Sequence, residues 1–310
     1  MNYDELQIEL GQPEYERNFI DFMKGNKHAE DKLRKGYNKG QGTYSLPYVA
    51  SKKCDGAITD ESTLRQLCTV IDSTSNMSHL FVNDAEEIAE YVGEGDLIHT
   101  HEFEQGTEIT SIKCHKLTIL VRAAEDFVYQ KTFDVEGLIT GRLARAFARG
   151  EDQGFLNGSG TDEPRGLLST EGAENGVTTS TLTYDDVIKL YFSVKPKYRK
   201  NGSWLMNDET AFALRTLKDA DGNYLWNAND NTILGKPVFI SEFMPNAESG
   251  KKPILFGDFS YYWIIRRSGV SVRPLTEVFA KWHQVGYLAH EYLDGLLSNK
   301  EAIKSLTMSK

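Results

Sequence analysis

The sequence contains few cysteines and no long apolar segment. Its 310 residues include three cysteines, Cys54, Cys68 and Cys114, an odd number without Cys-x-x-Cys spacing. This usage indicates reduced thiols in a cytosolic protein. No apolar run approaches the ~20 residues that a membrane helix needs. The first residues, MNYDELQIELGQ, have neither the basic segment nor the apolar core of a signal peptide, so we expect no membrane partner.

Basic residues are in deficit. The chain has 45 Asp and Glu against 35 Lys and Arg, a formal net charge of −10. Proteins that grip nucleic acid electrostatically use Lys and Arg to neutralise phosphates, so this balance argues against that function. A chain of this length can form one large domain or two modest ones around a substantial core.

Motifs of nucleotide-binding and hydrolytic enzymes are absent. The Gly-rich stretch FLNGSGTDEPRGLL, residues 155–168, contains no Gly-Lys-Ser/Thr, and its Asp162 and Glu163 would repel a phosphate. Ser159 stands directly between two glycines, which does not match the Gly-x-Ser-x-Gly pattern. We interpret the stretch as a helix stop and a turn, in which Pro164 blocks continuation of the helix. We expect no enzymatic activity.

Candidate metal ligands are weakly spaced. His99 and His101 alternate on a predicted strand, so both rings face one side, and Cys114 and His115 lie near the return strand. The sequence DADGN, residues 219–223, resembles a calcium loop but lacks the required Gly after its last residue. Solvated histidines and a plain turn are the more common interpretation, so we expect no metal and no cofactor.

An amphipathic helix is predicted near the N-terminus. Residues 14–24 place Tyr15, Phe19 and Phe22 on one face, and the polar, Gly-rich residues 25–44 predict a flexible tether. Such a helix is an arm, whose apolar face packs on the body of its own or of a neighbouring subunit.

Residues 77–113 predict a long two-stranded excursion. Strand-like pieces are separated by Gly93, Gly95 and Gly106, and the segment is too polar to be buried on both faces. An isolated hairpin is marginally stable, so we expect a partner surface to order it. The predicted subunit-interface residues come from the arm and this hairpin: Tyr15, Phe19, Phe22, Glu94, Asp96, His99, His101, Glu102 and Glu104.

The longest helical pattern begins at Asp134, which can cap it. One face of this helix carries Arg142, Arg145 and Arg149. That stripe could contact nucleic acid, although a solvated face or pairing with acidic neighbours is more common.

The rest of the chain predicts an α+β fold. Residues 162–267 contain short strands and a helix that Asn207 or Asp208 caps. After Ser268 and Gly269, the segments VSVRP and KWHQVGYLAHEYLDG predict further strands.

Five segments in order resemble the major capsid protein family of tailed bacteriophages, which has the Hong Kong 97-type fold. They are FLNGSGTDEPRGLL, WLMNDETAFALRTLKDADGNYLW, ILGKPVFISEFMP, ILFGDFSYYWIIRRSGVSV and FAKWHQVGYLAHEYLDG. Upstream, YERNFIDFMKG and LRQLCTVI are similar to the family's arm and the start of its body. The resemblance covers most of residues 14–308 and implies no metal or nucleotide cofactor.

The resemblance implies a division into five parts. These are an N-terminal arm and entry to the body (1–76), an extended β-hairpin loop (77–113), a peripheral domain with a long spine helix (114–162), an axial domain (163–267) and the C-terminal part of the peripheral domain (268–310). In this layout the hairpin lies over the adjacent subunit.

The function implied is that of a phage major capsid protein, which self-assembles through hexamers and pentamers into an icosahedral shell around double-stranded DNA. The DNA is enclosed without sequence-specific binding. Scaffolding, portal and decoration proteins are further candidate partners, and the shell would assemble in the host cytoplasm to become part of the virion. An encapsulin-type compartment shell is the alternative on the same fold. A soluble metal-dependent hydrolase that uses His99, His101 and His115 is a remote one.

Some members of the family join subunits by an isopeptide bond between a Lys of the extended loop and an Asn of a neighbour, with a Glu as base. Here no Lys occurs between Cys54 and Ile112, and Trp282 stands where the Asn is expected. His290 lies near the position of the Glu, and Glu291 faces the opposite side of the strand. We therefore expect shells without this covalent bond.

Overall fold

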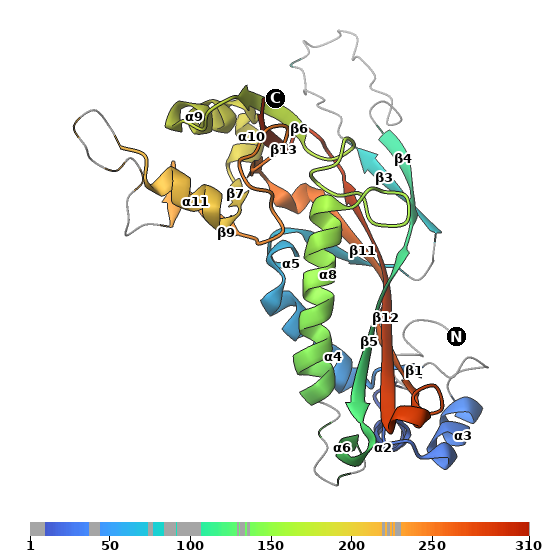
Figure 1. Ribbon diagram of the computed structural model, residues 1–310. Helices are drawn as coiled ribbons and strands as arrows, with labels where there is room; N and C mark the ends of the chain where they lie inside the picture. Colours follow the sequence, from blue (N-terminus) through green and yellow to red (C-terminus); the bar gives the residue numbers. More distant parts are fainter. Residues whose placement is uncertain are drawn as a thin grey trace.

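The computed structural model describes residues 10–36, 44–73, 77–83, 107–128, 137–218 and 231–309, together with the single residues 91, 130, 134, 221, 224 and 226. The described chain is elongated (Figure 1). Long strands and a helix beside them form a narrow lower part, and a second sheet with shorter helices forms a wider upper part.

A five-stranded sheet runs the length of the narrow part. Its strand order is β1 (Tyr44–Ser45), β11 (Tyr262–Leu275), β12 (Gln284–Leu297) and β5 (His115–Ala124), and β2 (Thr69–Asp72) pairs in parallel with β11. Along β12, Tyr287, Ala289, Glu291 and Leu293 are buried and alternate with less buried residues. This period of two is that of a strand with one face on the core.

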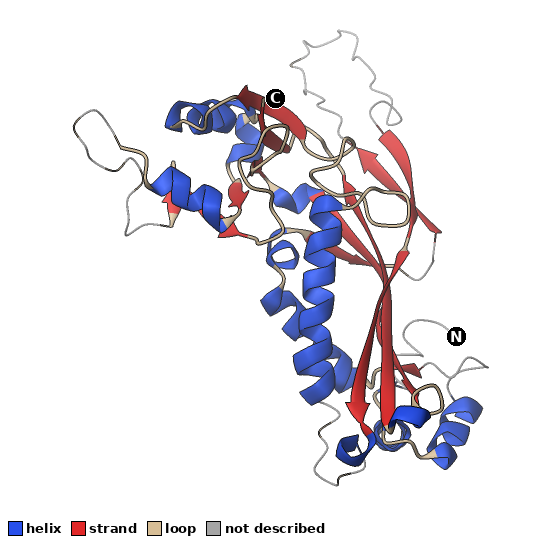
Figure 2. Ribbon diagram, viewed as in Figure 1, coloured by secondary structure: helices blue, strands red, loops and turns tan. Residues whose placement is uncertain are grey.

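A six-stranded sheet forms the wide part. Its order is β6 (Glu174–Thr179), β13 (Ile303–Met308), β10 (Ile254–Gly257), β7 (Ser203–Met206), β9 (Lys236–Ile240) and β8 (Thr232–Ile233). Both central strands, SWLM and ILFG, are buried at every position, as continuous apolar runs require. The helices α9 (Tyr184–Ser193), α10 (Pro196–Arg199) and α11 (Asp208–Arg215) lie around this sheet (Figure 2).

The predicted hairpin is confirmed at its base. Strands β3 (Met77–Asn83) and β4 (Thr107–Lys113) form a separate two-stranded sheet in which Asn83 pairs with Thr107. After Cys114, β4 continues into β5. The hairpin tip, residues 84–106, lies outside the described residues except for Tyr91. The predicted interface residues of the tip are therefore not placed: Glu94, Asp96, His99, His101, Glu102 and Glu104.

The N-terminal region forms helices α2 (Pro13–Met23), α3 (Lys27–Gly36), α4 (Tyr48–Glu61) and α5 (Thr63–Leu67). The predicted arm helix is thus confirmed, but the prediction of a flexible tether is wrong for residues 27–36. Ala29 and Leu33 of α3, four residues apart, are both buried in the core. The Asn26 side chain accepts a hydrogen bond from the His28 amide at 3.0 Å, which organises the start of the helix.

The predicted long helix begins with a π-helical turn, η1 (Leu138–Leu143), and continues as α8 (Ala144–Asn157) after the short α6 (Glu125–Val128). Asp134 accepts a hydrogen bond from the Gly137 amide at 2.9 Å, as expected of a cap. Arg142, Arg145 and Arg149 are exposed. Arg149 pairs with Glu242 at 2.7 Å, in agreement with a solvated face that pairs with acidic neighbours.

The stretch after α8 turns the chain, as predicted. Gly158 ends the helix, and a Cβ on it would lie 2.2 Å from the carbonyl oxygen of Pro164. Gly160 has φ of 78°, a left-handed conformation that favours glycine. Ser159 and Arg165 pair across the turn, so the stretch has a structural role.

The chain has two main apolar clusters among its described residues. One surrounds the six-stranded sheet and includes Trp204 and Phe256. The other lies between the long sheet and helices α2, α4 and α8, and includes Phe147 and Tyr287.

The division predicted at residue 267 does not follow these clusters. It cuts β11, which runs through a bulge from Tyr262 to Leu275. The final strand, β13, pairs with β10 and β6 of the six-stranded sheet. Residues 268–310 therefore contribute to both sheets: β11 and β12 belong to the long sheet, and β13 belongs to the six-stranded sheet.

The predicted capping of α11 by Asn207 can be tested by substitution. It caps α11 by accepting a hydrogen bond from the Thr210 amide at 2.8 Å, and its side-chain amide donates to Asn246. We expect Asn207→Ala to lower the free energy of unfolding by about 1–2 kcal/mol. Asn207→Asp, which retains an acceptor, should cost less. Urea denaturation measures both, and equal losses would contradict the capping role.

Candidate assembly interface

The three predicted interface residues of the arm are buried within their own chain. Tyr15, Phe19 and Phe22 are 1%, 1% and 6% exposed. The Tyr15 hydroxyl donates to the carbonyl of Ser45 at 2.6 Å, and Phe22 packs edge-on against Tyr44 with ring centroids 4.9 Å apart. The structure thus has the arm on its own body, and these side chains leave little surface for a neighbouring subunit.

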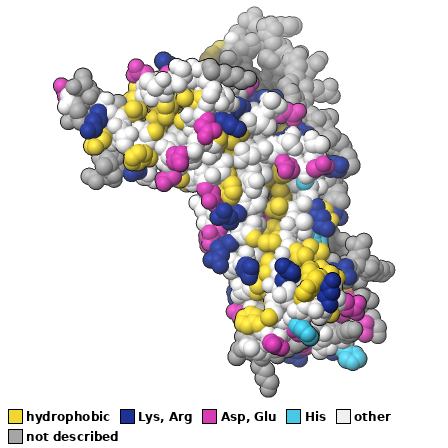
Figure 3. Space-filling view, viewed as in Figure 1, with side chains coloured by type: hydrophobic (Ala, Val, Ile, Leu, Met, Phe, Trp, Pro, Cys, Tyr) yellow, Lys and Arg dark blue, Asp and Glu magenta, His cyan; other side chains and the backbone are white. Residues whose placement is uncertain are grey.

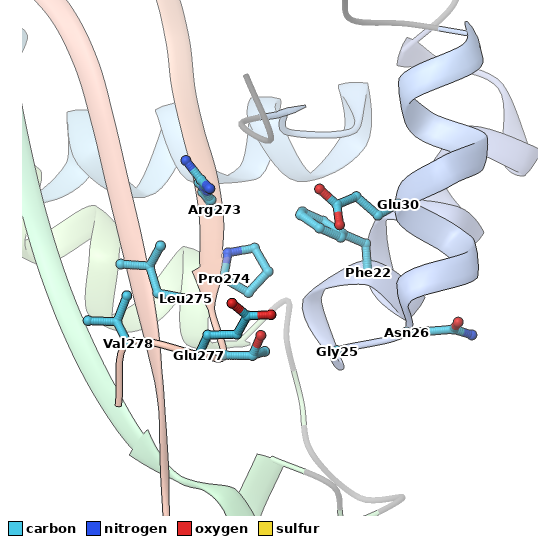
Figure 4. A pocket seen from close by; sticks show the side chains of 10 residues that line it. Phe22, Gly25, Asn26, Glu30, Arg273, Pro274, Leu275, Glu277 and Val278 are labelled. Carbon is cyan, nitrogen blue, oxygen red and sulfur yellow. The ribbon is translucent and has the colours of Figure 1, made fainter. Parts of the chain in front are cut away.

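A pocket of about 310 Å³ lies between the arm and the end of β11. Figure 4 shows Phe22 and Glu30 pointing from the arm toward Arg273, Pro274 and Glu277. The lining mixes apolar and charged side chains and includes neither Cys nor His, so it offers a transition metal no thiolate or imidazole ligand. The pocket thus lies at the contact between the arm and strand β11.

The outer face of the long sheet is basic and apolar. Lys116, Leu120 and Arg122 of β5 are exposed at alternate positions. Phe279 lies over Gly286, where a Cβ would approach its ring to 2.6 Å, and Arg122 is 5.6 Å from the centre of that ring.

The same face continues to Trp282, which is 53% exposed and lies 6.1 Å from Phe279 between ring centres. Lys281 stands 4.0 Å above the Trp282 ring. We refer to Lys116, Leu120, Arg122, Phe279 and Trp282 as the sheet surface. Figure 3 shows hydrophobic side chains next to Lys and Arg over the lower part of the molecule. Exposed aromatic and basic groups in one patch are typical of a protein-binding surface.

The hairpin tip has the opposite composition. Its sequence, residues 84–106, contains eight Asp and Glu and no Lys or Arg. Several apolar residues are interspersed, and Tyr91 is fully exposed. Acidic and apolar groups of this kind complement the sheet surface in charge and in hydrophobicity.

A buried group of charged residues lies where α4, α5, α8 and the long strands meet, and we refer to it as the junction. The Nε and Nη2 atoms of Arg65 donate to the two carboxylate oxygens of Glu151 at 2.6 and 2.5 Å. Glu291 of β12 has its nearer oxygen 3.8 Å from the same guanidinium. The exposed fractions of these side chains are 3%, 0% and 0%.

A second arginine extends the junction toward the surface. Arg266 of β11 pairs with Asp55 at 2.6 Å and with Asp72 at 2.9 Å. Burial lowers the pKa of its guanidinium, but Asp55 and Asp72 raise it by more, so that it stays charged. Burial raises the pKa of the Asp55 carboxyl, and Arg266 partly offsets that shift.

Asp152 joins the junction to the start of α5. It accepts hydrogen bonds from the Ser62 hydroxyl at 2.6 Å and from the Thr63 and Leu64 amides at 3.0 and 3.2 Å. Helix α5 thus begins on a carboxylate of α8. Sequence reasoning missed the junction, although Glu151 and Asp152 interrupt the otherwise basic and apolar sequence of α8.

The predicted relation of His290 and Glu291 is confirmed: Glu291 is buried, and His290, on the other face, is only partly buried. Burial and the nearby Lys116 lower the pKa of the His290 imidazole. The carboxylate of Glu291 thus lies inside the subunit, where it does not face a neighbouring copy.

Within the described ranges, no group of three or more His, Cys, Asp or Glu has the arrangement of a metal site. His115 is 4.0 Å from Asp294, whereas His99 and His101 lie outside the described residues. Burial raises the pKa of the Cys54 thiol to about 12, so it is no ready nucleophile. None of the described helices has the length and apolar character to span a membrane.

Comparisons with known proteins agree with this architecture. The model of the phage capsid family matches residues 42–308. A capsid structure from an empty GTA particle is 27% identical, with a TM-score of 0.65, over 81% of this chain and 90% of that chain. A capsid from the native GTA particle is 25% identical, with a TM-score of 0.67, over 88% and 95%.

A structure from Gordonia phage Cozz is 15% identical with a TM-score of 0.57, covering 81% of this chain and 87% of that chain. At this identity the likeness shows the fold alone. No curated protein matches the sequence.

Proposed function

Because the chain belongs to the phage capsid family, we propose that its copies assemble through hexamers and pentamers into an icosahedral shell around double-stranded DNA. The predicted Hong Kong 97-type α+β fold is confirmed by the similarity to capsid structures, and the chain is a phage major capsid protein of the virion. The family match carries this conclusion, since it covers both sheets and the helix between them.

The hairpin supplies the contact between copies in this proposal. Within the described residues its base pairs with neither of the two larger sheets. A two-stranded hairpin gains little stability by itself. A docking surface on another copy would stabilise the hairpin by binding its acidic and apolar tip.

The sheet surface of a neighbouring copy is the partner that we propose for this tip. Strand β4 leads from the tip into β5, which carries Lys116, Leu120 and Arg122 onward (Figure 1). Within one copy, the chain therefore runs away from the hairpin tip as it reaches the sheet surface. This direction favours a contact between the tip of one copy and the sheet surface of the next. A contact with the next copy is heterologous, and heterologous contacts that close produce rings.

The enclosed DNA is held without a basic lining in this proposal. A net charge of −10 disfavours strong attachment to a polyanion that must enter and leave the shell. Scaffolding, portal and decoration proteins are further proposed partners, and we place assembly in the host cytoplasm. Nuclease treatment of purified phage particles tests the cargo: protected double-stranded DNA is expected, and an enclosed enzyme without DNA would support the encapsulin-type alternative instead.

Charge reversal on the sheet surface should slow assembly. We expect Lys116→Glu combined with Arg122→Glu to reduce the rate, followed by light scattering, roughly ten-fold, because like charges then face the acidic tip. Added salt should shrink the difference. The matched control is Lys251→Glu with Lys300→Glu, two exposed lysines near the six-stranded sheet. Equal slowing in both variants would show that net charge, and not this surface, sets the rate.

A further inference from the structure

Glu291 is a buried carboxylate without a hydrogen-bond donor. Its side chain is 0% exposed, and neither of its oxygens has a hydrogen-bond partner in the described part of the chain. Arg65 is the nearest cation, yet its Nε and Nη2 atoms are directed to Glu151. A buried ionised carboxylate in this setting would lack compensation for the hydration that it loses on folding.

The other charged groups of the junction have partners of their own. Asp152 accepts three hydrogen bonds at the start of α5, and Arg266 is shared between Asp55 and Asp72. The titratable and charged groups around Glu291 come from each element packed against it: Cys54 and Asp55 (α4), Arg65 (α5), Asp72 (β2), Glu151 and Asp152 (α8) and Arg266 (β11). On the opposite face of the sheet, His290 of β12 and Lys116 of β5 lie toward the outside.

Carboxylates outnumber guanidinium groups at this place. Arg65 can balance one of the two glutamates, and Arg266 is already engaged by two aspartates. A proton is the simplest remaining source of balance, because a protonated carboxyl is both neutral and a donor. Glu151 is the adjacent carboxylate that can accept it.

We propose that Glu291 retains a proton that it donates to Glu151, and that this shared proton holds α5, α8 and β12 together at the junction between the two apolar clusters. When the proton is lost to solvent at alkaline pH, two carboxylates face one guanidinium, and the contact between the two parts of the subunit loosens. The subunit thereby has a built-in response to rising pH. This response belongs to the single chain and does not require that copies assemble.

The direction of the pKa agrees with this geometry. Burial, and then the charge of Glu151, raise the pKa of the Glu291 carboxyl well above its usual value, and Arg65 only partly lowers it. The folded pKa thus exceeds the unfolded one. The stabilising contribution is full below the unfolded value of about 4.3 and decreases as the pH rises toward the folded value.

Thermal unfolding of the full chain between pH 5 and 9 tests the proposal. The wild type should lose roughly 2 °C in Tm per pH unit above the unfolded pKa of Glu291, in addition to changes that all variants share. Glu291→Gln keeps the shape and an N–H donor toward Glu151, so it should remove that slope and exceed the wild-type Tm at pH 9. The control is Glu242→Gln, an exposed partner of Arg149, which should follow the wild type.

If the Tm of Glu291→Gln falls with rising pH as steeply as that of the wild type, the proposal is overturned. Infrared spectroscopy of the wild type provides an independent reading even if the variant folds poorly. A carbonyl band of a protonated, buried carboxyl should be present at pH 7 and decrease as the pH rises. Its absence at pH 7 would equally overturn the proposal, and neither result depends on whether shells form.

Discussion

Replacing the hairpin tip with a two-residue turn should abolish shell assembly and leave a folded subunit. Asn83 and Thr107 are directly paired at the end of the β3–β4 ladder, so an Asn-Gly linker in place of residues 84–106 can close a tight hairpin. The two main apolar clusters contain no described residue of the hairpin strands. We therefore expect a nearly unchanged circular dichroism spectrum and Tm, together with a sedimentation profile without shells.

A second variant separates the charge of the tip from its presence. Glu94→Gln, Asp96→Asn, Glu102→Gln and Glu104→Gln together remove four of the eight acidic charges of the tip and retain its length. This variant should still assemble, but more slowly and with a weaker dependence on salt. Shells of normal size and yield from the tip-deleted chain would refute the proposed contact between copies.

Arg65→Met should be among the most destabilising single changes in the body. It leaves Glu151 and Glu291 buried without their guanidinium, which costs about 3–5 kcal/mol in comparable buried pairs. Burial lowers the pKa of Arg65, but Glu151 raises it by more, so the charged form is the one that folding retains. Urea denaturation of the unassembled chain measures the loss.

Two further variants control this experiment. Arg149→Met removes an exposed ion pair with Glu242 and should cost less than about 1 kcal/mol. The double variant Arg65→Met, Glu151→Met exchanges the buried pair for apolar side chains and should recover only part of the loss, because Glu291 then lacks the acceptor for its proton. If Arg65→Met costs no more than Arg149→Met, the junction does not stabilise the subunit in the way described.

Local patterns were sufficient to predict several elements. The short, mostly apolar run SWLM predicts a buried strand, and it forms the central strand β7. Asn207 at the start of α11 and Pro164 after α8 have their roles through neighbours within a few residues. The ladder from Met77 to Lys113 likewise follows from alternation and turn residues close in sequence.

Other features depend on contacts that no local pattern encodes. Among the residues of α3 whose burial is described, Ala29 and Leu33 are the buried ones, so the stability of this helix comes from the cluster on which it packs. Arg65 and Glu151 are 86 residues apart, and Glu291 comes from another strand. A single sequence contains no signal that pairs them. Strand β13 likewise pairs with β10, although β11 and β12 lie between them in the sequence.

Electron microscopy of the purified chain shows directly whether copies of this subunit build a capsid. The unmodified chain should form closed shells of uniform size, or rings and tubes built from the same subunit contacts. These particles should disappear when residues 84–106 are replaced by the Asn-Gly turn. A chain that stays monomeric under all assembly conditions, with its fold intact, would contradict the conclusion that copies of this subunit build a capsid.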